Sequence, residues 1–313
     1  MTLSTRIKSI LKKSCSMKKY YHKIKSRFIS VLYTISPVLL ARYLFRIKRG
    51  RSLNLKNPQT FDEKLLWLNL YWRHPLKTQC ADKYMMRAYV KNHGLGHMLP
   101  ELLGVYEKSK DIDFNALPER FVLKCTHGNG FNIICLNKSK LDLEETRHKL
   151  DAWMKIDSSK RAGELHYALI KPRIICEVYL DDSTGGLPVD YKIQCFDGKA
   201  YCTLVCCERH IDEHDVKLAF YDREWKKKLP YVKSGILAKK DIPMPGTYPE
   251  MVDAAEKLSK PFPHVRVDFY NINGKAVIGE MTFTQAGCIF TVLTDVAEEE
   301  LGKLIKLPEK FFV

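Results

Sequence analysis

Apolar positions follow a helical period in some parts of the chain and form short continuous runs in others. Apolar residues recur at helical spacing from Phe61 to Trp72. Thr60, followed three residues later by Glu63, forms a capping-box pattern that begins this helix. Further helices are predicted over residues 82–93, 143–156 and 249–260.

Short apolar runs bounded by Gly, Asn and Asp predict strands. The Asp197–Gly198 and Asn271–Gly274 turns each join two such runs as a hairpin. The predicted strands cover residues 120–124, 131–136, 173–180, 189–197, 199–208, 216–222, 264–270 and 275–283. Antiparallel hairpins with helices packed over them favour an α+β fold.

Basic residues are concentrated at the N-terminus of this chain of 313 residues. The first 61 residues hold 15 Lys or Arg and no acid, whereas the remainder holds 37 basic and 36 acidic residues. The formal charge of +16 therefore belongs to an N-terminal arm, and the body is nearly neutral. Proteins that bind nucleic acid usually spread their basic residues over the folded face, so we expect no nucleic-acid partner.

The arm contains an apolar segment, residues 28–41, which includes Pro37 and is too short to span a bilayer. We interpret residues 6–49 as a basic, partly amphipathic helical arm that could lie on an anionic membrane surface. The alternative is a packing helix with a solvated basic face. The segment lacks the small-residue cleavage site of a secretory signal.

Ten cysteines are scattered through the chain, mostly within apolar runs, and no pair has C-x-x-C spacing. Such cysteines are typical of small apolar core residues in a reducing compartment. We therefore expect a cytoplasmic protein, with a peripheral position on the inner membrane face as a further possibility through the arm.

Two lysines stand at the edges of apolar segments. Lys83 stands at the start of the helix predicted over residues 82–93, and Lys124 ends a strand that leads into the loop His127–Gly130. An ammonium group beside a glycine loop is suited to hold phosphate, because the glycines let backbone N–H groups approach its oxygens. The alternative for each lysine is a side chain that simply extends to solvent.

Charged residues also occupy alternate positions on the last predicted hairpin. Period-two spacing places Arg266 and Asp268 on one face of one strand, and Glu280 and Thr282 on one face of the next. Paired antiparallel, these strands would present an oxygen-only site that suits Mg²⁺, with a guanidinium beside it. The alternative is a cross-strand salt bridge between Arg266 and Glu280.

A third feature is the apolar strand that carries Glu177 and ends at Leu180, before a turn. Free backbone groups at such a turn could recognise the edge of a purine. The alternative is an ordinary strand with one solvent-facing glutamate.

Taken in this order, the features resemble the ATP-grasp fold. Within that superfamily the chain resembles the TupA-like ATP-grasp proteins of surface-polysaccharide biosynthesis, of the teichuronopeptide or capsule type, over residues 42–302. The motifs that carry this resemblance lie at residues 57–67, 81–84, 189–192, 195–198, 265–268 and 279–283.

The resemblance implies a nucleotide held between two α+β subdomains, at residues 57–176 and 177–313, preceded by the basic arm at 1–56. It implies Lys83 and Lys124 for the α and β phosphates. The loop over these phosphates would be formed by His127, Gly128 and Gly130. Adenine would be recognised by Glu177 and the backbone through Leu180.

The same resemblance assigns the reacting end of the nucleotide. Lys192 would approach the γ-phosphate, and Arg266 would stabilise an acyl phosphate and a tetrahedral intermediate. Asp268, Glu280 and Thr282 would ligate Mg²⁺, although Thr282 stands where the wider superfamily has Asn.

The reaction implied is ATP-dependent ligation of a carboxylate to an amine, with ATP and Mg²⁺ as cofactors. The partners would be a sugar, a uronic acid or a lipid-linked glycan, together with an amino acid. Three alternatives remain open: a sugar kinase on the same fold, a glycosyltransferase of the same pathway, and a non-catalytic adaptor at the membrane surface.

Overall fold

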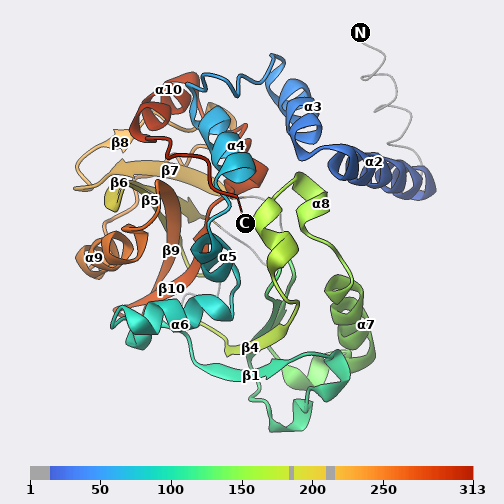
Figure 1. Cartoon of the computed structure of the whole chain (residues 1–313). Helices are drawn as coiled ribbons and strands as arrows, with labels where there is room; N and C mark the ends of the chain where they lie inside the picture. The colour runs from blue at the N-terminus through green and yellow to red at the C-terminus, as the bar shows by residue number, and fades with distance from the viewer. Residues whose placement is uncertain (1–14, 183–186, 209–215, 313) are drawn as a thin grey trace.

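The computed structural model describes residues 15–182, 187–208 and 216–312, and its strands form two antiparallel sheets (Figure 1). The larger sheet has six strands in the order β10-β9-β5-β6-β7-β8. In chain order these are β5 (Asp190–Phe196), β6 (Lys199–Cys207), β7 (Lys217–Asp222), β8 (Lys228–Leu229), β9 (His264–Ile272) and β10 (Lys275–Thr282). The predicted α+β class is confirmed, and both predicted hairpins are present as β5–β6 and β9–β10.

Five helices, three that precede the two sheets in the sequence and two from the C-terminal third of the chain, share the core of the large sheet. They are α4 (Phe61–Tyr71), α5 (Pro75–Ala81), α6 (Met85–Asn92), α9 (Tyr248–Ser259) and α10 (Asp295–Leu304). The capping box predicted for α4 forms, because the Glu63 carboxylate accepts from the backbone N–H of Thr60 at 3.2 Å. Helix α4 is apolar on nearly every side, so it is covered by α10 as well as by the sheet.

The smaller sheet has four strands in the order β1-β4-β2-β3. They are β1 (Leu102–Tyr106), β2 (Phe121–Cys125), β3 (Asn132–Cys135) and β4 (Ile174–Val178). With α7 (Leu143–Met154), these strands enclose a second hydrophobic core. We call residues 102–156 together with β4 the small lobe, and the remaining body the large lobe.

The two cores divide the chain by packing. Residues 61–98 share the core of the large sheet, whereas the sequence-based division places them with the small sheet in 57–176. The reason is physical: the apolar surface of α4 and α6 needs the larger sheet to cover it. Helix α8 (Ser159–Ala162) and the short helix Leu165–Leu169 also lie against the large lobe.

Further short 3-10 helices connect these elements. They are Gly96–Met98, Ser109–Asp111, Phe114–Ala116, Lys138–Lys140, Ser234–Ile236 and Gln285–Cys288.

Two helices make up the described part of the N-terminal arm: α2 (Cys15–Ile35) and α3 (Pro37–Arg49). Leu40 and Phe45 of α3 are fully buried, and Arg49 forms ion pairs of 2.6 Å with Asp62 and Glu298. The inner face of α3 thus belongs to the packed body, while α2 extends away from it (Figure 1). None of the helices described is both long and apolar enough to cross a membrane. The first 14 residues of the predicted arm lie outside the described chain.

Candidate active site

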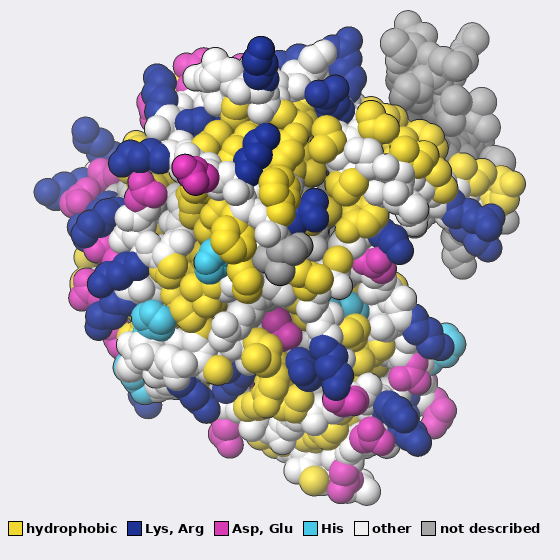
Figure 2. Space-filling model, viewed as in Figure 1, with side chains coloured by type: hydrophobic (Ala, Val, Ile, Leu, Met, Phe, Trp, Pro, Cys, Tyr) yellow, Lys and Arg dark blue, Asp and Glu magenta, His cyan; other side chains and the backbone are white. Residues whose placement is uncertain are grey.

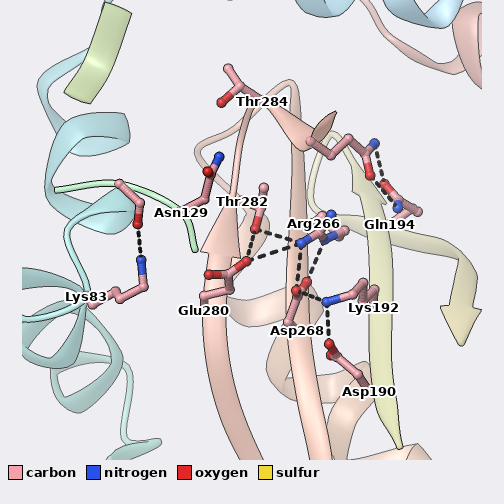
Figure 3. Close-up of polar contacts among 12 residues, drawn as sticks. Lys83, Asn129, Asp190, Lys192, Gln194, Arg266, Asp268, Glu280, Thr282 and Thr284 are labelled. Atoms are coloured by element: carbon pink, nitrogen blue, oxygen red, sulfur yellow. Dashed lines mark hydrogen bonds and ion pairs between the residues drawn. The ribbon is translucent and has the colours of Figure 1, made fainter. Parts of the chain in front are cut away.

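A cluster of charged side chains lies on three adjacent strands of the large sheet, β5, β9 and β10 (Figure 3). The register places Lys192 opposite Asp268, and Asp268 opposite Glu280. Thr282 pairs in turn with Arg266. Alternation places the charged side chains of each strand on one face, and a register shift between Ile278 and Glu280 aligns β10 with β9, so that all five side chains lie on the same face of the sheet.

Asp268 is the centre of this cluster. Its two oxygens accept from Nε and Nη2 of Arg266 at 2.6 and 2.7 Å, and from Nζ of Lys192 at 2.5 Å. Lys192 also forms an ion pair of 2.6 Å with Asp190. Arg266 reaches further to Glu280 at 3.2 Å and to the hydroxyl of Thr282 at 3.0 Å. The cross-strand salt bridge anticipated as an alternative is thus present within the same cluster.

The charges of the cluster are mutually stabilised. Burial acts to lower the pKa of Lys192, but Asp190 and Asp268 outweigh it and raise that pKa. Desolvation acts to raise the pKa of Glu280, but Lys83, Arg266 and Lys192 lower it to about 2. The Glu280 carboxylate is therefore ionised throughout the physiological range.

The donors for a divalent cation are all oxygens, which is the chemistry that Mg²⁺ prefers. Asp268, Glu280 and Thr282 are the candidates, and Glu280 has a side chain that is 38% exposed. Across the described residues, no group of three or more His, Cys, Asp or Glu could hold a metal ion. The protein therefore offers two carboxylates and a hydroxyl, a set that fits a cation whose remaining ligands come from a substrate and water.

Lys83 faces this cluster from the junction of α5 and α6 (Figure 3). Its Nζ donates to the carbonyl oxygen of Gly128 at 2.6 Å, so the lysine holds the glycine loop. Burial lowers the pKa of Lys83, and the charge of Glu280 opposes that effect. A Cβ atom at Gly128 would lie 2.3 Å from Oγ of Ser158 and 2.8 Å from the ring of Phe131, so a larger residue would displace these neighbours. Gly130 has a φ of +72°, a conformation that glycine adopts without strain.

The imidazole of His127, the first residue of the predicted phosphate loop, is packed inside the small lobe. It is 2% exposed, packs against Phe131, and its Nε2 lies 3.1 Å from the carbonyl oxygen of Trp153. Burial lowers its pKa, so the ring is neutral and anchors the base of the loop. Only the backbone of this residue remains as a candidate for phosphate contact.

Lys124 and Glu177 form one ion-pair chain with Arg87 of α6. Glu177 accepts from Lys124 at 2.7 Å and from Arg87 at 2.8 Å, and it is 5% exposed. The alternative of a solvent-facing glutamate is therefore wrong. Both carboxylate oxygens of Glu177 accept hydrogen bonds within the protein, so the carboxylate positions Lys124. Any contact with a nucleotide base would come from the backbone that follows Glu177.

A pocket of about 150 Å³ lies beside this ion-pair chain, between the two sheets. Lys124, Glu177 and Leu180 line it from the small lobe and the strand end, and Tyr270 lines it from β9. Its other walls are mainly apolar: Pro100, Val122, Ile134, Val178, Tyr179, Leu187 and Pro188, with Asn132. The structure thus brings three of the predicted nucleotide-binding residues into one pocket suited to a flat apolar ring.

Residues not predicted from the sequence extend the charged cluster. Glu164 is 4% exposed, accepts from the Thr284 hydroxyl at 2.6 Å, and accepts from Nδ2 of Asn129 at 3.5 Å. Burial raises the pKa of Glu164 to about 7. Thr284 continues the alternation begun by Glu280 and Thr282, so the sequence pattern could have predicted its place in the site. Nothing in the sequence around Glu164 indicates that this residue belongs to the site.

A buried amide pair lies next to Arg266 in the sheet. Gln194 and Gln285 exchange hydrogen bonds of 3.1 and 3.2 Å (Figure 3). Nε2 of His264 lies 3.2 Å from the side-chain oxygen of Gln194. Gln194 is the register partner of Arg266 on β5. These contacts fix the strand positions from which the charged side chains project.

Comparison with known proteins gives one family match and several distant structural ones. The D-alanine–D-alanine ligase of Bacillus anthracis is 15% identical with a TM-score of 0.43, over 79% of this chain and 69% of that chain. The corresponding ligase of Helicobacter pylori is 13% identical with a TM-score of 0.41, over 74% and 60%. A D-cycloserine synthetase is 15% identical with a TM-score of 0.41, over 74% and 70%.

No curated protein matches the sequence significantly. The family described as TupA-like ATPgrasp matches residues 63–306, which include both lobes and every strand of the two sheets. The resemblance noted in the sequence is thereby confirmed, and the chain belongs to the TupA-like ATP-grasp family.

Proposed function

We propose that this protein is an ATP-dependent ligase that joins a carboxylate to an amine through an acyl phosphate. The observation that carries the proposal is the cluster of Lys192, Arg266, Asp268 and Glu280, which faces a lysine-anchored glycine loop. Membership of an ATP-grasp family supports the nucleotide as the second component.

The nucleotide would lie between the lobes. Adenine would occupy the pocket lined by Leu180 and Tyr270, with Lys124 at its edge. Lys83 and the loop at Gly128 would then hold the phosphates, since ammonium groups and backbone N–H groups are the donors that bind phosphate oxygens. Lys192 would approach the γ-phosphate from β5.

The reaction balances without a protein nucleophile. A carboxylate oxygen of the substrate attacks the γ-phosphorus and ADP leaves, which forms an acyl phosphate. The nitrogen of a neutral amine then attacks the carbonyl carbon, phosphate leaves with the bonding electrons, and the amine loses one proton. Arg266 would stabilise negative charge on the oxygens of the acyl phosphate and the tetrahedral adduct.

Asp268, Glu280 and Thr282 would hold Mg²⁺ together with phosphate oxygens of the nucleotide. When bound, the cation neutralises charge that develops on the transferred phosphoryl group. Arg266 and Lys192 hold both oxygens of Asp268 in place, and their charges oppose the burial that raises the pKa of this carboxyl.

The substrates are proposed from the family resemblance. We infer that the carboxylate belongs to a sugar, such as a hexuronic acid or a glycan linked to lipid, and that the amine belongs to an amino acid. The product would be an amide within a surface polysaccharide.

Calorimetric titration with ATP and Mg²⁺ tests the nucleotide site. We expect micromolar affinity in the wild type, a loss of about tenfold or more in Lys124→Ala, and loss of the magnesium dependence in Asp268→Asn. Lys171→Ala is the matched control, because Lys171 is an exposed lysine near β4 whose partner is Glu107. Equal affinities in wild type and Lys124→Ala would contradict this placement.

Turnover then tests the reaction. Release of ADP and phosphate that requires both a uronic acid and an amino acid supports the ligase. Phosphate found on the sugar, with no amide formed, would identify a kinase instead. Turnover of a nucleotide sugar without ATP would overturn the proposal in favour of a glycosyltransferase.

A further inference from the structure

Helix α2 carries a stripe of exposed apolar side chains. Tyr20, Ile24, Phe28, Val31 and Ile35 are between 46% and 69% exposed. At 3.6 residues per turn these five positions fall within about 80° of arc, so they form one continuous line along the helix. Figure 2 shows hydrophobic side chains at the surface along this helix.

The opposite side of α2 is the one that packs on the protein. Ile29 is 8% exposed, and α2 contacts both α3 and α8. Ile29 lies about half a turn from the centre of the stripe. The body therefore holds the helix by one face and presents the apolar face outward.

Helix α3 continues the same surface. The ring of Phe28 meets that of Tyr43 edge to face, with 5.1 Å between centroids. Beyond this contact, Leu39 and Ile47 of α3 are 47% and 62% exposed. The two stripes are thus joined into one apolar surface across both helices.

Positive charge borders the stripe on both sides. Lys23 and Arg27 lie along one edge of α2 and Lys25 along the other, and all three are exposed. Arg42 and Arg46 are exposed on α3. The sequence contains no acidic residue before Asp62, so no carboxylate of this region opposes an anionic surface.

We propose that α2 and the outward face of α3 bind the interface of a bilayer that contains anionic lipids. The apolar stripe would enter the boundary between headgroups and acyl chains, and the flanking cations would meet the headgroup phosphates. Helix α2 has 21 residues, or about 30 Å of length, which suits a flat surface better than a compact protein pocket. This mode requires no membrane-spanning helix, in agreement with the described chain.

Vesicle sedimentation tests the proposal with the full chain. Wild type should bind vesicles of phosphatidylcholine and phosphatidylglycerol in equal parts, and bind phosphatidylcholine alone much less. Ile24→Ser/Val31→Ser keeps the charge and should lower the partition coefficient by about tenfold or more. Leu136→Ser/Leu143→Ser is the control, because these two side chains are exposed apolar groups of the small lobe. This control should bind as wild type does.

A second pair of variants tests the charge. Lys25→Gln/Arg27→Gln should weaken binding to the anionic vesicles, and added salt should weaken wild-type binding in the same direction. ATP affinity should be unchanged in every arm variant. Failure of the membrane proposal is therefore distinguishable from failure of the ligase proposal. Wild type that stays in the supernatant with both vesicle types would overturn the proposal. So would self-association that depends on Ile24 and Val31 without lipid binding.

Discussion

Replacing Glu164 with glutamine should remove a component of stability that depends on pH. The carboxyl of Glu164 is buried between Thr284 and Asn129, and desolvation raises its pKa from 4.5 to about 7. In the unfolded chain the same group ionises near 4.5. Between these two values the unfolded chain loses its proton first, so rising pH favours unfolding.

The size of the effect follows from the shift. A shift from 4.5 to about 7 corresponds to about 3 kcal/mol of unfolding free energy, lost progressively across that window. Solvent screens little of this free-energy difference, since Glu164 is only 4% exposed. Glutamine carries no titrating proton, so the unfolding free energy of the variant should not fall in this way. Relative to wild type it should rise by about 3 kcal/mol as the pH increases from about 4.5 to about 8.

Urea unfolding at about pH 5, 6.5 and 8 measures the difference. Glu144→Gln is the matched control, because Glu144 is exposed on α7. The control should follow wild type at each pH. A gap between Glu164→Gln and wild type that stays constant from pH 5 to 8 would refute a near-neutral pKa at this position.

Three further substitutions test packing, one in the glycine loop of the site and two where α10 and α3 meet α4. Gly128→Ala should lower ATP affinity by about tenfold, because the new methyl would collide with Ser158, and Ser158→Gly should restore part of it. Gly302→Ala should destabilise by about 1–3 kcal/mol in thermal unfolding, since its Cβ would lie 2.4 Å from the backbone oxygen of Gln59. Arg49→Ala should cost about 3–5 kcal/mol in urea unfolding, because two buried carboxylates lose their common cation. Unchanged unfolding midpoints in either of the last two would contradict the packing described.

The hairpins of the large sheet, and the alternation of charged residues along their strands, were predictable because they depend on local patterns. The Asn271–Gly274 turn joins β9 to β10, and alternation then decides which side chains share a face. Alternation pairs Arg266 with Asp268 and Glu280 with Thr282, but the two pairs share a face only because the register shifts between Ile278 and Glu280, which the sequence pattern did not predict.

Other parts depend on contacts between segments far apart in the sequence. Lys83 reaches Gly128 only because the small lobe docks beside α5 and α6, and Glu177 meets Arg87 for the same reason. Helix α5 was not predicted because its seven residues are too few to show a helical period. Helix α10 was not predicted because its acidic residues obscure the apolar face of that helix. Glu164 acquires its raised pKa from burial, which no local pattern around it announces.

The chain's connectivity also has a consequence for its synthesis. The small lobe encloses its own core and is complete once β4 has been made, so it can fold while translation continues. The large lobe must wait: α4 is covered by α10, and the backbone of Phe311 pairs with Tyr71 and Arg73. Until α10 has been synthesised, the apolar face of α4 that it covers remains exposed. A chain truncated before α10 would therefore leave this apolar face of α4 exposed, and we expect chaperones and proteases to recognise it.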